Sequence, residues 1–151
     1  MNQEQQEQYI KTRVDNQINW LDRKSSFNQK RYKLYRTLVI ILSISLPFLT
    51  GYADMEKYGP YIKFGVGVIG VIIAVIEGII VLQKHQENWV QYRATCETLR
   101  QEKMLFTYKA GEYAKSTTPF QDFVLKIESI LGNENKQWTK YIVQNEDGTN
   151  A

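Results

Sequence analysis

One acidic residue lies within an otherwise apolar stretch of the sequence. Glu77 is the single charged residue from Phe64 to Leu82. A carboxylate that faces lipid costs roughly 2.5–3.5 kcal/mol on insertion scales, so such an acid is expected to face a bundle interior or a water-filled cavity. The two apolar stretches offer no obvious cation at the same depth. Two interpretations follow: copies of Glu77 surround the axis of a symmetric assembly and favour cations, or Glu77 reaches the membrane interface near Lys84 as a hydrogen-bonding group.

Small residues share one side of this stretch when it is drawn as a helix. They recur every three or four residues and are Gly67, Gly70, Ala74, Gly78 and Val81. Small side chains let a second helix backbone approach closely, which is how helices associate in membranes. Together with Glu77, the candidates to line a pore are Gly70, Ala74 and Val81. The candidates for helix packing on this stretch are Gly67 and Gly78.

Residues 65–70 also match G-x-G-x-x-G, the pattern of dinucleotide-binding turns. Such a site needs a strand before the glycines and a helix that opens at them, whereas here a charged loop precedes glycines that lie within the apolar stretch. The chain has one cysteine and one histidine, too few for most metal sites and for a disulfide framework. No nucleophile stands in plausible spacing with a base. We predict no catalytic residue, no metal, no cofactor and no enzymatic activity.

The apolar stretch nearer the N-terminus contains a proline. Pro47 cannot donate a backbone hydrogen bond and leaves the carbonyl of Ser43 free. Ser43, Pro47 and Thr50 share one helix face. This slightly polar strip can line water or pack on the other apolar helix, and packing is the more frequent use.

Two membrane-spanning helices are expected to position these residues. The apolar stretches cover residues 37–53 and 64–82, and the first is roughly 25 Å long as a helix, near the lower limit for a hydrocarbon core of about 30 Å. The connector contains Gly59-Pro60, a turn signal, so the two helices should be antiparallel neighbours. The alternative is a buried core hairpin of a soluble protein, but the flanks are too polar to cover two helices that are apolar all round.

Basic residues predict the orientation of this hairpin. The connector carries Lys57 and Lys63. Just before the first stretch lie Lys24, Lys30, Arg31, Lys33 and Arg36, and Lys84 and Arg93 follow the second. By the positive-inside rule, both termini are cytoplasmic and the connector lies outside. The basic cluster suits the anionic inner leaflet. A net charge of +3 over 151 residues is too small to indicate a nucleic-acid partner.

The flanks of the hairpin have helical periodicity. An apolar stripe lies upstream, at Ile10, Val14, Ile18 and Leu21. A cytoplasmic seam with heptad spacing lies downstream, at Trp89, Tyr92, Cys96, Leu99 and Phe106. His85 and Lys103 make this seam imperfect; we expect it to pack against the upstream helix, against a second copy, or both. The expected cytoplasmic helices are 3–36, 83–114, 119–131 and 135–143, followed by a disordered tail over 144–151.

The order of these features resembles a known superfamily. The resemblance is carried by Asp15-Asn16-Gln17, Trp20, Asp22-Arg23-Lys24, Asn28, Arg31-Tyr32, Arg36 and Pro47, then by residues 89–93, Glu97, Leu99, Glu102, Phe106, Tyr113, Phe123, Glu128 and residues 135–138. Over residues 5–140 the chain resembles the SLATT superfamily and, more narrowly, the bacterial domain-of-unknown-function 4231 family. The resemblance implies two transmembrane helices with cytoplasmic extensions and a role as a membrane effector in bacterial conflict systems, forming pores after a nucleotide signal.

We therefore predict an all-α, two-span hairpin with long cytoplasmic helices in the bacterial inner membrane. Its expected partners are the lipid bilayer, further copies of itself in a symmetric homo-oligomer, and inorganic cations. The expected function is an ion-conducting pore. The alternative is a non-conducting membrane scaffold whose cytoplasmic helices bind a partner protein.

Overall fold

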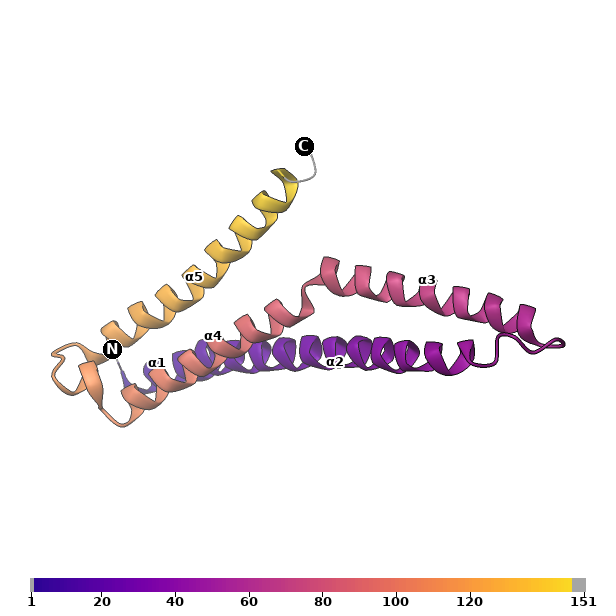
Figure 1. The fold of residues 1–151 in the computed structure, drawn as a ribbon. Helices are drawn as coiled ribbons and strands as arrows, with labels where there is room; N and C mark the ends of the chain where they lie inside the picture. Colours follow the sequence, from indigo (N-terminus) through magenta and orange to yellow (C-terminus); the bar gives the residue numbers. More distant parts are fainter. Residues whose placement is uncertain (1, 148–151) are drawn as a thin grey trace. The chain divides into compact units, whose positions relative to one another are not determined.

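The computed structural model describes the backbone of residues 2–147 and the side chains of residues 2–133. Every regular element in this range is helical (Figure 1), which confirms the prediction of an all-α chain. In chain order the elements are α1 (Gln3–Tyr9), the π-helix η1 (Ile10–Asp15), α2 (Asn16–Thr50), α3 (Gly59–Gln83), α4 (His85–Thr107), the 3₁₀ helix η2 (Gly111–Ala114) and α5 (Pro119–Asp147).

The chain folds into two compact units, which we describe separately. The hairpin unit, Ser25–Val90, contains most of α2 and all of α3. The terminal unit combines Met1–Lys24 with Gln91–Ala151 and contains α1, η1, η2 and α5.

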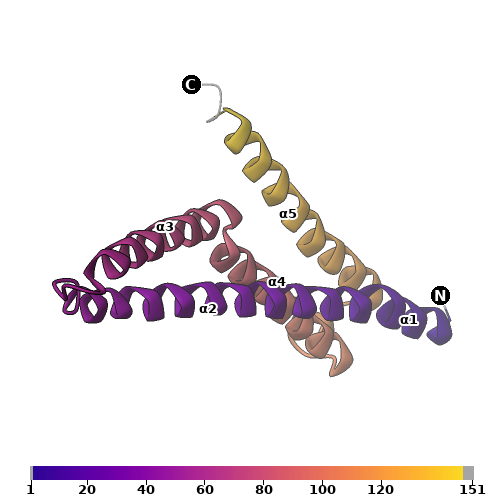
Figure 2. The same ribbon diagram turned by 90° about the vertical axis from the view of Figure 1, so that its right-hand side faces the viewer.

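In the hairpin unit, α3 returns antiparallel beside α2 (Figure 2). The buried or half-buried positions recur every three or four residues on each helix, the spacing of one helix face. On α2 they include Tyr32, Tyr35, Val39, Leu42, Leu46 and Leu49. On α3 they include Ile62, Val66, Ile69, Ile73, Ile76 and Ile80. The packing of these faces on each other produces the antiparallel pair that the short connector predicts.

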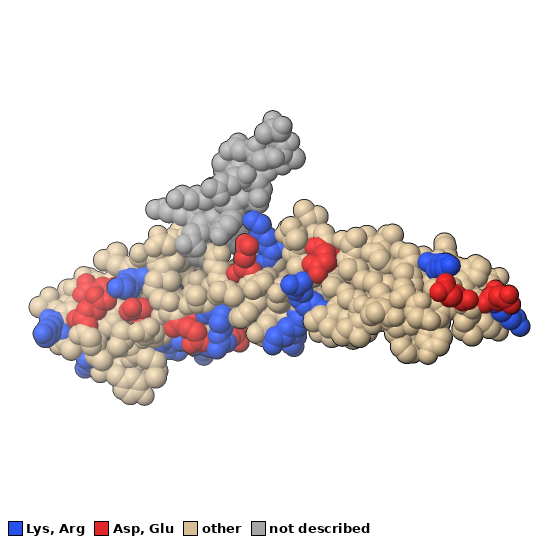
Figure 3. Space-filling view, viewed as in Figure 1, with Lys and Arg blue, Asp and Glu red and all other residues tan. Residues whose placement is uncertain are grey.

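The outer faces of the hairpin unit are apolar and exposed. The large exposed side chains include Ile40, Ile44, Phe48, Phe64, Val71 and Val75. Two helical stretches, one containing α2 and the other α3, are long and apolar enough to cross a membrane, and none of the most apolar part of the second is buried. Charged side chains gather at the connector, while the adjoining hairpin surface in this view is free of them (Figure 3). Within the described chain, the outer faces of this hairpin are therefore not buried in a core.

The connector between the two helices depends on a glycine. Gly59 begins α3 and donates its backbone N–H to the carbonyl of Met55 at 2.7 Å. A Cβ atom at Gly59 would lie only 2.4 Å from the carbonyl oxygen of Ala53. Pro60 follows in the first turn of α3, where a missing N–H is tolerated. The turn signal in the sequence thus marks the start of α3, ahead of the apolar stretch.

We expect Gly59→Ala to destabilise the hairpin unit by about 1–3 kcal/mol, the range for inserting an atom into a well-packed site. The measurement is thermal unfolding of the full chain in detergent. Gly132→Ala is the matched control, because a Cβ atom there meets nothing within 4 Å; it should be neutral or stabilise by up to about 1 kcal/mol. Equal melting temperatures of the two variants would contradict the close contact of Gly59 with the Ala53 carbonyl.

The cytoplasmic helix expected over residues 83–114 is shorter in the structure and is separated from the helix of the second apolar stretch. Lys84 has a left-handed backbone, with φ 45° and ψ 35°, and separates α3 from α4. The next helix, α4, ends at Thr107, and Lys109 has φ 50°. Positive φ is uncommon for residues other than glycine, so the lysines give no sequence signal of a break.

The terminal unit has one apolar core. The largest fully buried side chains in the described part of the chain belong to it: Phe123, Leu21, Leu99, Ile127, Val14 and Cys96. The upstream stripe and the downstream seam therefore pack on each other within one chain, which is the first of the packing alternatives left open by the sequence. The helix α5 closes this core.

The C-terminal region forms one helix where two are predicted. Pro119 begins α5, as expected, but α5 continues through Gly132 to Asp147. A glycine within a helix costs about 1 kcal/mol relative to alanine, which weakens a helix without ending it. Residues 144–147, predicted to be disordered, are helical; the rest of that predicted tail lies outside the described residues.

Candidate functional site

Glu77 has a cationic partner within its own chain. Arg36 Nη1 lies 2.8 Å from Glu77 Oε1, and the two side chains are 48% and 39% exposed. The partner comes from just outside the two apolar stretches, and it is Arg36 on the other helix of the hairpin. Arg36 immediately precedes the first apolar stretch, and a long arginine side chain can extend along apolar surface to reach an acid. The pair joins α2 to α3.

The antiparallel register of the hairpin explains which residues meet. Arg36 and Glu77 are equally far along the chain from a point between Glu56 and Lys57, within the connector. Asn28 and His85 are also equally far from that point, and they too are in contact: Asn28 Oδ1 lies 2.8 Å from His85 Nδ1. The two pairs share one register, so either pair, once known, indicates the other.

The small-residue face of α3 is open. Its five members, Gly67, Gly70, Ala74, Gly78 and Val81, are all exposed. A Cβ atom at any of the three glycines would meet nothing within 4 Å. An apolar groove of about 480 Å³ includes Phe64, Gly67 and Val71 among its lining residues. The pore-lining candidates Gly70, Ala74 and Val81 therefore lie on this open face. The fourth candidate, Glu77, is half-buried at its edge.

The proline face of α2 does not pack on α3. Ser43, Pro47 and Thr50 are exposed, so the expectation that they pack against the other apolar helix is wrong within one chain. The packed face of α2 carries Val39 and Leu42 instead. Thr50 Oγ1 donates a hydrogen bond to the carbonyl of Pro47 at 3.0 Å, and this local bond satisfies a polar side chain without help from a second helix. Small polar residues and larger apolar residues can both fit a helix interface, and the register decides between them.

A polar cluster is buried where α4 begins. His85 is 9% exposed; its Nδ1 donates to Asn28 Oδ1, and its ring centroid lies 5.9 Å from that of Tyr35. Ser25 Oγ donates to the backbone carbonyl of Trp89 at 3.1 Å. His85 Nε2 and Trp89 Nε1 are buried without a hydrogen-bond partner among the described atoms. Burial lowers the pKa of His85, and the nearby positive charge of Arg31 lowers it further.

We expect acid to destabilise the hairpin unit through His85. Its pKa is lower in the folded chain than its ordinary value of 6.5, so the neutral form is the one that fits the fold. The stabilisation is fully present above pH 6.5 and is lost as the pH falls below it. The melting temperature in detergent should fall between about pH 7.5 and about pH 5.5. Because His85 is the sole histidine of the sequence, His85→Gln should flatten this profile, and an unchanged slope would contradict the assignment.

Polar residues of the terminal unit pair with each other. Lys103, which interrupts the predicted seam, forms an ion pair with Asp15. Arg13 donates hydrogen bonds of 2.9 and 2.8 Å to the carboxylate of Glu128 and thereby lowers its pKa. Tyr9 also donates to Glu128, and burial is the main cause that raises the pKa of Tyr9 to about 12. The contacts of Tyr9 and Arg13 with Glu128 attach α5 to α1 and η1.

The predicted seam residues lie where the heptad spacing puts them. Tyr92, Cys96 and Leu99 are buried, whereas Trp89 and Phe106 are half-buried. Burial raises the pKa of the Cys96 thiol, which keeps it protonated and poorly nucleophilic. In the part of the chain that the structure describes, no three His, Cys, Asp or Glu side chains gather as a metal site would require.

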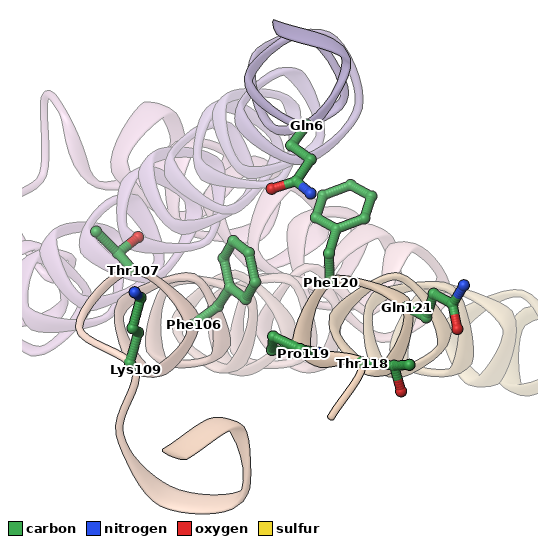
Figure 4. A pocket seen from close by; sticks show the side chains of 8 residues that line it. All are labelled: Gln6, Phe106, Thr107, Lys109, Thr118, Pro119, Phe120 and Gln121. Atoms are coloured by element: carbon green, nitrogen blue, oxygen red, sulfur yellow. The ribbon is translucent and has the colours of Figure 1, made fainter. Parts of the chain in front are cut away.

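A cavity in the terminal unit was missed by the sequence analysis. It has a volume of about 410 Å³ and is lined by Gln6, Phe106, Thr107, Lys109, Thr118, Pro119, Phe120 and Gln121 (Figure 4). The rings of Phe106 and Phe120 meet edge to face, with centroids 5.8 Å apart. α1, α4 and α5 all contribute to its wall, so no local pattern in the sequence could reveal it.

Comparisons with known proteins give one match. The family model described as "Protein of unknown function (DUF4231)" matches residues 16–121. Searches of curated proteins and of solved structures found no significant match. The matched range includes the whole hairpin unit and the seam of α4.

Proposed function

Since the chain belongs to the DUF4231 family, whose function is unknown, we propose a function from its own residues. It is an integral protein of the bacterial inner membrane whose hairpin unit spans the bilayer with both termini in the cytoplasm. Further copies associate through the open face of α3, and the assembly conducts inorganic ions.

The open small-residue face of α3 carries this proposal. Gly67, Gly70 and Gly78 have free space where a side chain would be, because nothing lies within 4 Å of a Cβ atom placed there. Without water to drive association, membrane helices gain their stability from close backbone contact at such residues. A symmetric assembly of hairpins supplies that contact at Gly67 and Gly78, and Gly70, Ala74 and Val81 then lie toward its interior.

The ion pair changes the role that we assign to Glu77. A carboxylate bonded to Arg36 at 2.8 Å contributes little net charge, so a ring of these pairs would not by itself select cations. We assign the pair to holding α2 and α3 together at the rim of the conducting path, with the small residues as its lining.

Ion flux from liposomes tests the proposal. Liposomes that contain the purified full chain should release ions, and Gly70→Leu should abolish release, because a leucine side chain at this position obstructs the interior of the assembly. Val75→Leu is the matched control, because Val75 is exposed on a different face of α3. Equal flux in the two variants would exclude the glycine face from the assembly, and flux retained in Glu77→Gln would exclude Glu77 from the path.

The second candidate is a non-conducting membrane scaffold whose terminal unit binds a cytoplasmic protein. The observation that favours it is the Arg36–Glu77 pair, which satisfies the intramembrane acid without a hydrated axis. Absence of flux from the pure protein, with recovery of one stoichiometric partner in a pull-down, would support the scaffold over the pore.

A further inference from the structure

The first turns of α2 in the hairpin unit are basic and carry no acid. Residues 25–36 contain Lys30, Arg31, Lys33 and Arg36, without one aspartate or glutamate. Arg36 is paired with Glu77, and Arg31 donates to the Tyr35 hydroxyl at 3.3 Å. Lys30 and Lys33 are exposed and form no ion pair or hydrogen bond with the described side chains. Two cations of this segment therefore remain available.

Exposed apolar side chains lie on the same side of the segment. Phe27 and Leu34 are 53% and 54% exposed, and their separation of seven residues places them on one helix face. Lys30 lies between them on that face, and the guanidinium of Arg31 lies 5.1 Å from the Phe27 ring centroid. The opposite face, which carries Asn28 and Tyr32, is the packed one. The open face is thus both apolar and basic.

Its charge excludes a second copy of the same face as the occupant. Two such faces would bring lysines and arginines together with no acid to offset them, and like charges in contact disfavour association. The complementary partner is anionic with an apolar portion. That chemistry is found in anionic phospholipids, which carry a phosphate diester next to acyl chains.

The position of the segment points to the same partner. Lys33 and Leu34 lie three to four residues before the first apolar stretch, or roughly 5–6 Å along a helix. The polar layer of a bilayer extends about 5–8 Å beyond the hydrocarbon on each side. Lys30 lies roughly 10 Å out, close to the screening length of about 8 Å at physiological salt. Lys33 and Leu34 therefore lie at the depth of lipid headgroups once the hairpin unit spans the bilayer, and the long side chain of Lys30 can reach that layer from just outside it.

We propose that the open face of residues 27–34 binds the headgroups of anionic phospholipids, with Lys30 and Lys33 at the phosphate and Leu34 at the adjoining acyl chain. This inference rests on insertion of the hairpin unit into a membrane, which is part of the proposed function, but it does not depend on conduction.

The test is lipid retention by the full chain. The protein is reconstituted into vesicles of equal parts phosphatidylglycerol and phosphatidylcholine, re-extracted in mild detergent, and examined by native mass spectrometry for bound lipid. A basic residue near an anionic surface contributes a factor of about five in binding. We therefore expect phosphatidylglycerol enriched over phosphatidylcholine in the unsubstituted chain, and a loss of at least about fivefold in that ratio in Lys30→Gln/Lys33→Gln.

Lys11→Gln/Lys115→Gln is the control, because it removes two exposed lysines of the terminal unit and makes the same change in total charge. It should keep the enrichment. An equal ratio of the two lipids in the unsubstituted chain would overturn the inference, as would an unchanged ratio in the first double variant or an equal loss in both. Flotation of the protein with vesicles is measured first: failure to float contradicts the membrane proposal itself, whereas flotation without enrichment overturns the lipid inference alone.

Discussion

Phe123→Ala is expected to destabilise the terminal unit by about 3–5 kcal/mol, the usual cost of removing a fully buried phenylalanine side chain. Phe123 has no exposed surface, and its ring stacks on that of Phe106 with centroids 4.5 Å apart. A loss of this size is a large share of the roughly 5–15 kcal/mol that stabilises an ordinary domain. Urea unfolding of the full chain in detergent, followed by circular dichroism, gives the measurement.

Leu125→Ala is the control for this core substitution. Leu125 lies two residues further along α5 and is 71% exposed, so its truncation should change stability by no more than about 0.5 kcal/mol. Equal losses in the two variants would mean that α5 does not close the core of the terminal unit.

Reversing one charge of the Arg36–Glu77 pair is expected to weaken the hairpin unit strongly. Arg36→Glu places two carboxylates against each other, and Glu77→Arg places two guanidinium groups there. In the membrane-spanning hairpin that we propose, an unpaired charge at the centre of a span costs roughly 2.5–3.5 kcal/mol on insertion scales, and this is the upper limit of the loss expected for each single variant. The double reversal, Arg36→Glu/Glu77→Arg, should recover most of it, because it restores opposite charges.

Thermal unfolding in vesicles measures this cycle, and a second ion pair provides the control. Lys63 and Asp54 lie 3.8 Å apart at the connector and are 66% and 100% exposed, so exchanging them should have little effect. Failure of the double reversal to recover stability would show that the 2.8 Å contact of Arg36 and Glu77 does not connect the two helices in the bilayer.

The features that could be predicted from the sequence depend on solvent preference and helical spacing. The all-α class and the antiparallel neighbours follow from two long apolar stretches and a short connector. Tyr92, Cys96 and Leu99 could be placed on one buried face because heptad spacing fixes which side chains share a side. The membrane span and the assembly remain proposals, since both require a surrounding that one chain does not contain.

The features that could not be predicted depend on register between helices. His85 and Lys103 are polar residues in an otherwise apolar seam, and only the neighbouring helix explains them. Asn28 lies opposite His85, and Asp15 lies opposite Lys103. Glu77 likewise acquires Arg36 only when α3 lies beside α2. The break at Lys84 is a backbone conformation that its side chain does not indicate.

By itself, the sequence of this protein determined that apolar side chains would form two long helices and that an apolar seam would join the flanking helices. Residue type and spacing determine both, because they decide which side chains avoid water and which of them share a helix face. The tertiary structure decided which charges meet, which face of α3 stays open and where the helices end. Those outcomes depend on which atoms come within a few ångströms of each other, and that distance is set only when the helices pack.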